Sequence, residues 1–195
     1  GKVYAIGGHS SASGRNKGVA TVEIFDPANE SWTDGPDLPT ATTRFGIAVQ
    51  GSQILVVGGA AAQSARATNQ VHVLQTAEIP LRWQSLPDMP TAREALGVGY
   101  SSGTVYACGG SNSATEGMKT FEIFDSQGRK WTKGPDMQRG REHVGVAASG
   151  SKVYAVGGYQ NEDVVEIFDQ DDAAQAWKPG PPLRNGVWGA AVVVA

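Results

Sequence analysis

A Gly-Gly doublet that recurs along the chain is the sequence feature that most constrains the fold. It stands at Gly7-Gly8, Gly58-Gly59, Gly109-Gly110 and Gly157-Gly158, and each copy closes a short apolar run. A tryptophan follows each doublet, at Trp32, Trp83, Trp131 and Trp177. Successive doublets begin 51, 51 and 48 residues apart. Self-similarity at such a period is typical of propeller blades, arrays and solenoids.

The spacing inside the repeat divides it into two halves. Each of the first three tryptophans lies 26 residues before the next doublet, whereas the distance from a doublet to its own tryptophan shrinks through 24, 24, 21 and 19 residues. One half of the unit therefore has a fixed length, and the other contains a loop of variable length. This is the pattern of a stacked supersecondary unit with insertions at one edge.

The pattern of apolar residues and turns predicts four short strands in each repeat and no helix. In the first repeat we expect strands over Lys2–Ile6, Thr21–Asp26, Ser31–Thr33 and Phe45–Gln50. The residues Asp26-Pro27-Ala28-Asn29 have the composition of a turn. The chain is thus predicted to be all-β, a single domain over residues 1–195 of four four-stranded antiparallel blades, with repeats of about 46–51 residues.

Small residues recur at alternate positions of the first strand of each blade. Examples are Gly46 and Ala48, and Gly97 and Gly99, which suit a crowded innermost strand. We assign the eight doublet glycines and the four tryptophans structural roles, the tryptophans as packing anchors between blades.

The two ends of the chain fall at complementary positions of the repeat. Residue 1 precedes the second strand of a unit, and residue 195 follows a first strand, Ala190–Val194. This C-terminal strand is predicted to complete the first blade and close the ring, which removes sheet edges. Four repeats cut from a longer propeller would have the same phase, so this alternative stays open. The first residue is Gly1 rather than Met, which indicates a piece excised from a longer protein.

Composition and motifs exclude several functions. The net charge of −3 comes without a basic stripe, which argues against nucleic acid as a main partner, and no apolar run is long enough to span a membrane. A single cysteine, Cys108, indicates a reducing compartment, and we expect a cytoplasmic protein. His9, His72 and His143 lie apart without metal-ligand spacing, and the chain has no phosphate loop or nucleophile elbow. We therefore expect no metal, no cofactor and no enzymatic activity.

The doublet, the downstream tryptophan and the strand Val165-Glu166-Ile167-Phe168-Asp169 together resemble the kelch repeat. The resemblance covers the whole chain in four copies, of which the second is degenerate, with Val71-His72-Val73-Leu74 in place of the acidic-aromatic strand. It implies a β-propeller that acts as a protein- or peptide-binding module. Many kelch proteins are substrate adaptors of cullin ubiquitin ligases, so this role is implied as well.

The resemblance also implies a binding face at one end of the blades. In kelch adaptors, arginines near the start of the inner strand and polar residues after the doublets bind acidic peptides. Carried over by position, the candidates are Arg44, Arg93, Arg141, His9, Ser111, Tyr159 and Trp188. The opposing interpretation is that these arginines are solvated or pair with neighbours such as Glu94 and Glu142.

Two other functions stay open at this stage. The first is a structural scaffold whose blade sides are covered by a larger assembly. The second is a sugar-processing enzyme of the kelch-like kind, with Glu142 and His143 as the candidate acid-base pair. The sequence leaves the partner's identity and the oligomeric state undetermined.

Overall fold

The computed structural model describes residues 1–11 and 17–194, and this part of the chain forms twenty strands and no helix. The all-β prediction is confirmed. Residues 12–16, within the predicted loop His9–Ala20, and Ala195 lie outside the described residues. The first predicted loop nevertheless contains a short hairpin of β2 (His9–Ser10) and β3 (Lys17–Gly18).

Three of the four sheet units are complete antiparallel blades of four strands. The second unit contains β7 (Gly46–Gln50), β8 (Gln53–Val57), β11 (Val71–Gln75) and β12 (Trp83–Leu86). The third contains β13 (Gly97–Ser101), β14 (Thr104–Cys108), β15 (Phe121–Asp125) and β16 (Lys130–Lys133). The fourth contains β17 (Gly145–Ser149), β18 (Lys152–Val156), β19 (Val165–Asp169) and β20 (Lys178–Pro179).

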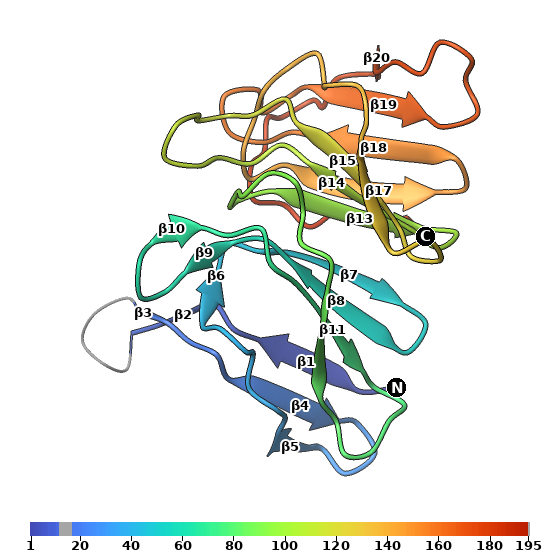
Figure 1. The fold of residues 1–195 in the computed structure, drawn as a ribbon. Helices are drawn as coiled ribbons and strands as arrows, with labels where there is room; N and C mark the ends of the chain where they lie inside the picture. Colours follow the sequence, from blue (N-terminus) through green and yellow to red (C-terminus); the bar gives the residue numbers. More distant parts are fainter. Residues whose placement is uncertain (12–16, 195) are drawn as a thin grey trace.

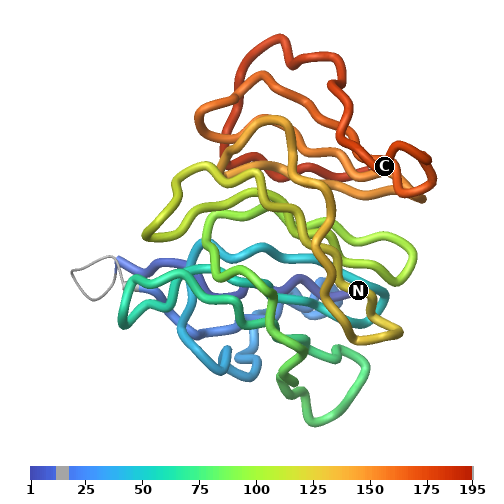
Figure 2. The backbone as a smooth tube through the Cα atoms, turned by 45° about the horizontal axis from the view of Figure 1, so that its top comes forward, coloured from blue at the N-terminus to red at the C-terminus, as the bar shows by residue number. Residues whose placement is uncertain are grey.

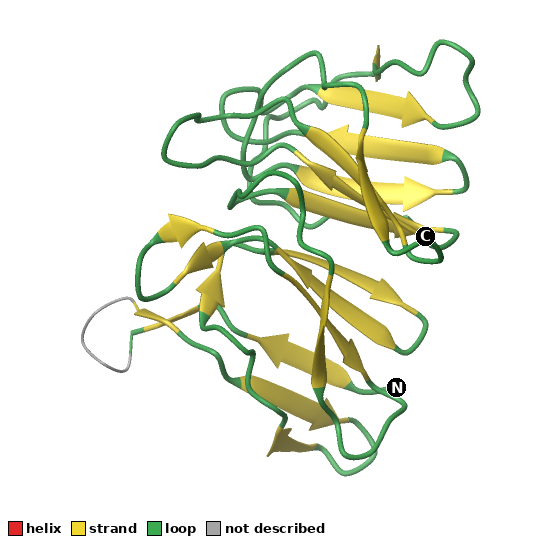
Figure 3. Ribbon diagram, viewed as in Figure 1, coloured by secondary structure: helices red, strands yellow, loops and turns green. Residues whose placement is uncertain are grey.

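The first unit has three strands instead of four. It consists of β1 (Val3–Ile6), β4 (Val22–Asp26) and β5 (Ser31–Asp34), in that order across the sheet. A separate small sheet joins β6 (Thr42–Thr43), β9 (Ala60–Ala61) and β10 (Arg66–Ala67) near the second unit. The four units follow one another in chain order from the blue N-terminal sheet to the orange-red C-terminal sheet (Figure 1), and Figure 3 shows the strands and loops in the same view.

The inner strands of neighbouring blades pack directly on one another, with β13 between β7 and β17. Their glycines allow this approach, because Val98 lies over Gly46 and Val146 lies over Gly97. The side chains between the sheets form two buried clusters, one around Leu55, Val105 and Phe124 and the other around Phe121, Val153 and Phe168.

Three of the four repeat tryptophans link consecutive blades. The indole nitrogens of Trp83, Trp131 and Trp177 donate hydrogen bonds of 2.9, 2.8 and 3.0 Å to the carbonyl oxygens of Pro36, Pro87 and Pro135 in the preceding repeat. Trp32 departs from the predicted role, because no described blade precedes the first unit. Its side chain is 54% exposed, and its ring lies against Phe25 of its own sheet, with ring centroids 5.2 Å apart.

The closing strand predicted at Ala190–Val194 does not form. Val192 packs over Gly145 in the way that Val146 packs over Gly97, so the C-terminal segment occupies the place of a following inner strand. No further sheet follows the fourth unit among the described residues, so the segment has no strand to pair with at that place. It also does not reach the first unit, where β1 pairs only with β4 in the described chain. The first and last units lie at opposite ends of the stack in Figure 1, and the C-terminal segment lies with the fourth unit, away from the blue first unit, in Figure 2, so the stack is an open arc.

Candidate functional site

The segments that follow the doublets meet the segments that precede the inner strands at one end of the blades. Short antiparallel pairings join Thr43 to Ala60, Glu94 to Ser111 and Glu142 to Tyr159. We call this end the loop face. It comprises the β2–β3 and β9–β10 hairpins and residues 42–45, 93–96, 111–116, 141–144, 159–163 and 187–189.

A ladder of main-chain hydrogen bonds supports the loop face. The amides of Ala95, His143 and Gly189 donate to the carbonyl oxygens of Arg44, Ala95 and His143 at 2.7, 2.7 and 2.8 Å, so the ladder joins the second, third and fourth units and the C-terminal segment in series. All four residues have positive φ, between 52° and 67°. Non-glycine residues adopt this region rarely, so the repeated geometry marks an architectural constraint at this position.

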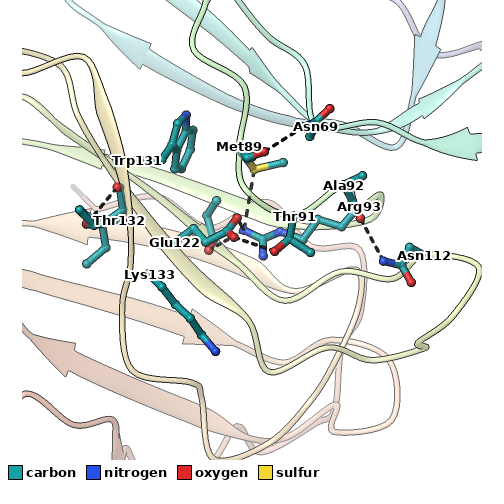
Figure 4. A network of polar contacts seen from close by, with 12 residues as sticks. Asn69, Met89, Thr91, Ala92, Arg93, Asn112, Glu122, Trp131, Thr132 and Lys133 are labelled. Carbon is teal, nitrogen blue, oxygen red and sulfur yellow. Dashed lines mark hydrogen bonds and ion pairs between the residues drawn. The ribbon is translucent and has the colours of Figure 1, made fainter.

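The structure corrects the prediction that Arg93 and Arg141 line a binding face. Both side chains are 0% exposed. Arg93 pairs with Glu122 at 3.0 Å and donates to the carbonyl oxygen of Ala107 at 3.2 Å (Figure 4). Arg141 pairs with Glu166. These guanidinium groups are inside the third and fourth blades and are not available to a peptide.

The glutamate of each buried pair accepts a further hydrogen bond. Thr91 donates its hydroxyl to Glu122 at 2.7 Å, as Figure 4 shows, and the amide of Gln138 donates to Glu166 at 2.6 Å. Burial lowers the pKa of both arginines, and the facing glutamates oppose this shift. Buried charges of this kind are retained only when paired and hydrogen-bonded.

In the second repeat neither the arginine nor the glutamate of this buried ion pair is present. Thr42 stands at the position of Arg93, four residues before the inner-strand glycine, and His72 stands at the position of Glu122. Thr42 and His72 are 5% and 9% exposed. In the degenerate second copy the two positions are therefore still buried, but they hold Thr42 and His72 instead of an ion pair. The internal comparison of the repeats is the sequence signal that would have identified the buried role of Arg93.

Arg44, the remaining candidate arginine, does lie on the loop face. Its guanidinium pairs with Glu94 at 2.8 Å, and the two side chains are 42% and 17% exposed. The interpretation that the candidate arginines pair with neighbours such as Glu94 therefore holds for Arg44, whereas Arg93 pairs with Glu122 inside the blade. The difference follows from the positions of the two arginines in the repeat. Arg44 lies two residues before its inner-strand glycine, at the ladder position with positive φ, whereas Arg93 lies four residues before its own glycine.

Trp188 and Tyr159 come together at the C-terminal side of the loop face. They are 60% and 47% exposed, and their ring centroids are 6.3 Å apart in an edge-to-face arrangement. The ring of His143 packs against Trp188 at 5.5 Å. Sequence reasoning connected His143 with Glu142 rather than with these two rings.

His9 and Ser111, the other two candidates, lie apart from this aromatic cluster. His9 is exposed on β2, and Ser111 is 7% exposed, with its main chain paired to Glu94. A cavity of about 520 Å³ adjoins Ser111, between the β9–β10 hairpin and the loop at 112–114, and its lining includes Arg66, Glu94 and Asn112. Arg66 makes no ion pair with any described residue, and the sequence analysis did not single it out.

Two kinds of feature are absent from the described residues. No group of three or more histidine, cysteine or carboxylate side chains among residues 1–11 and 17–194 could hold a metal ion. Nor does that part of the chain contain a helix long and apolar enough to cross a membrane.

Comparison with known families matches the Kelch motif to residues 1–39, 92–138 and 140–184, which is most of the chain. The chain belongs to the kelch-repeat family. The unmatched stretch, residues 40–91, contains the second repeat, in which Thr42 and His72 replace the buried ion pair. The sequence-based recognition of kelch repeats and of propeller-type blades is confirmed.

Curated relatives cover little more than half of this chain. Kelch-like protein 40 of Xenopus tropicalis is 27% identical over 55% of the chain, and Kelch-like ECH-associated protein 1A of Danio rerio is 27% identical over 58%. Kelch-like protein 15 of Danio rerio is 36% identical over 30%. The matched regions span only 16%, 18% and 10% of these three proteins.

Proposed function

We propose that this chain is a protein- or peptide-recognition module that binds its partner on the loop face. The observation that carries the proposal is the exposed pair Trp188 and Tyr159, held on a rigid backbone ladder. Large aromatic side chains provide most of the binding energy in many interfaces, and rigid scaffolds with exposed loops are common recognition surfaces. Kelch-like relatives support the same class of function.

The charges of the loop face indicate which side chains the partner presents. Arg66 has no ion-pair partner among the described residues and lines the cavity beside Asn112. Arg44 already pairs with Glu94. We therefore assign recognition of an acidic side chain to Arg66 first and Arg44 second, and recognition of an apolar or aromatic side chain to Trp188 and Tyr159.

The proposal extends to the cellular role. By its resemblance to kelch adaptors, the module selects substrates for a cullin ubiquitin ligase in the cytoplasm. The described residues are propeller-type blades, so substrate binding on the loop face is the part of that role assigned to them.

The test is a pull-down from cell extract with the chain as bait, read by mass spectrometry. A Trp188→Ala/Tyr159→Ala variant and an Arg66→Ala variant are compared with Ile79→Ala, which removes an exposed apolar side chain (94% exposed) between β11 and β12, outside the loop face. We expect the first two variants to lose partners that Ile79→Ala keeps. Equal recovery of all partners would place binding on the blade sides and support the scaffold function instead.

A further inference from the structure

The second and third blades enclose a small cavity at the end of the blades opposite the loop face. Its volume is about 80 Å³. Leu55 of β8 and Phe124 of β15 belong to its apolar lining, and Ser126 and Arg129, in the turn between β15 and β16, belong to its polar lining. Both blades have all four strands, so the cavity lies between two complete sheets in the interior of the chain.

Comparison of the repeats explains why the cavity is there. Leu55 stands where the other three repeats have a tyrosine, at Tyr4, Tyr106 and Tyr154. Between the third and fourth blades, the hydroxyl of Tyr106 donates to the side-chain oxygen of Gln170 at 2.8 Å. Ser126 is the counterpart of Gln170, because each follows the aspartate that ends the third strand of its blade. Leu55 has no hydroxyl to donate there, and Leu86, in place of a glycine in the other repeats, narrows the space without filling it.

The polar groups of the cavity are donors that lack a charged acceptor. The hydroxyl oxygen of Ser126 is buried and has no hydrogen-bond partner among the described residues. Arg129 is exposed at the rim and forms no ion pair within the described chain. The other polar residues of the lining are neutral, namely Gln53, Gln75 and Gln84. The cavity therefore has one positive charge and no negative one.

The second repeat has lost a carboxylate at this place. Gln75 stands where the other repeats have an aspartate, at Asp26, Asp125 and Asp169. In the fourth repeat this aspartate pairs with a lysine on the neighbouring strand, Lys152, at 4.0 Å. Gln53 occupies the lysine position in the second repeat and lies opposite Gln75. The internal charge pair is thus replaced by two neutral amides, which leaves Arg129 as the charge that a ligand would meet.

We propose that this cavity binds a carboxylate carried on a short apolar stem. The carboxylate accepts hydrogen bonds from the Ser126 hydroxyl and the Arg129 guanidinium, and the stem packs against Leu55 and Phe124. Guanidinium groups match carboxylates in geometry, and such charge-assisted hydrogen bonds are stronger than neutral ones. A free short-chain carboxylate and a glutamate side chain of a partner both have this chemistry. The site is separate from the loop face and does not depend on the function proposed there.

Propionate and propanamide provide the test, because they have nearly the same shape and differ in charge. Each is titrated into the whole isotope-labelled chain, and binding is followed by the NMR shifts of the main-chain amides. We expect propionate to bind about tenfold more tightly than propanamide. The shifts should be largest at residues 53–55 and 126–129.

Variants of the chain locate the contact. In Arg129→Gln the affinity for propionate should fall about tenfold, to the level of propanamide. Arg82→Gln, which removes an exposed arginine outside the cavity lining, should leave both affinities unchanged. Ser126→Ala should weaken propionate about threefold by removing one hydrogen bond. Leu55→Tyr restores the tyrosine of the other repeats, fills the cavity and should abolish binding of both compounds.

Two peptides identify the source of the carboxylate. They consist of glycines around a single central glutamate or a single central glutamine. A glutamate peptide that binds more tightly than propionate assigns the site to a partner's side chain, whereas weaker binding assigns it to a free carboxylate.

The proposal is overturned if propionate does not bind, or if it binds no more tightly than propanamide. Propionate binding that persists in Leu55→Tyr would overturn it as well, because that result places the ligand outside the cavity. Unfolding midpoints check that each variant remains folded, and the Arg129→Gln and Ser126→Ala results decide the question if Leu55→Tyr does not fold.

Discussion

Arg141 and Glu166 form an ion pair inside the fourth blade, where their side chains are 0% and 1% exposed. The pair joins the segment before the inner strand to the third strand of the same sheet, and Arg93 and Glu122 repeat it one blade earlier. Arginine and glutamate, which usually lie on the surface of a protein, therefore form part of the interior here.

Removing one member of the pair should be strongly destabilising. Arg141→Met leaves the carboxylate of Glu166 buried without its cation, and we expect unfolding free energy to fall by about 3–5 kcal/mol. Urea unfolding followed by tryptophan fluorescence measures the change. The double variant Arg141→Met/Glu166→Leu should recover most of the loss, since it leaves no lone buried charge. A double variant less stable than the single one would contradict this account.

The exposed and buried tryptophans of the repeat provide a matched pair. Trp131→Ala should cost about 3–5 kcal/mol, because the ring is 9% exposed and its bond to Pro87 crosses the blade interface. Trp32→Ala should cost less than about 1 kcal/mol, because that ring is 54% exposed. Chemical denaturation of the two variants checks the prediction, and similar losses would show that Trp32 is covered in solution.

The first glycine of each doublet should not tolerate a side chain. Gly109 has φ of +64°, and a Cβ added there would lie 2.5 Å from the carbonyl oxygen of Arg141. Gly51 has a φ of +55°, and no atom lies within 4 Å of a Cβ added there. Substitution of Gly51 therefore measures the cost of the positive φ alone, without a steric contact. We expect Gly51→Ala to cost about 1–2 kcal/mol and Gly109→Ala a further 1–3 kcal/mol for the close contact. Thermal unfolding of the two variants should therefore separate clearly.

His72 should make stability depend on pH. Burial lowers its pKa, and Asp88 only partly opposes the shift. A folded-state pKa below the unfolded value of about 6.5 means that the unfolded chain binds more protons between the two values. Stability contributed by His72 is thus present above about pH 6.5 and lost as the pH falls toward the folded-state pKa.

The measurement compares wild type with His72→Gln, which does not titrate. Between about pH 7.5 and about pH 5.5 the wild type should lose more unfolding free energy than the variant. Parallel pH profiles would show that His72 is protonated as easily in the fold as in the unfolded chain.

Local pattern was sufficient to predict the long strands of the blades, because the alternation in Phe121–Asp125 and the doublets depends on neighbouring residues alone, but it missed the short strands β2, β3, β6, β9 and β10. The fate of Ala190–Val194 was not predictable in this way. A strand needs a partner, and whether β1 is within reach is set by the curvature of the whole stack.

The candidate site shows the same division. Trp188 and Tyr159 were placed on one face from their repeat positions, and the structure brings their rings within contact. The resemblance assigned both Arg44 and Arg93 to the binding face, and Arg93 more strongly, but Arg44 lies at the ladder position with positive φ and Arg93 is buried in the blade. Counting back from the inner-strand glycine, by two residues or by four, distinguishes them.

The ladder that runs from Arg44 through Ala95 and His143 to Gly189 uses only main-chain atoms. A cation, a methyl group, an imidazole and a bare hydrogen thus occupy equivalent places without altering the bonds between blades. Architecture and chemistry are separated at these positions. The side chains at this end of the blades can therefore vary from one repeat of this chain to the next, while the main-chain bonds that join the blades stay the same.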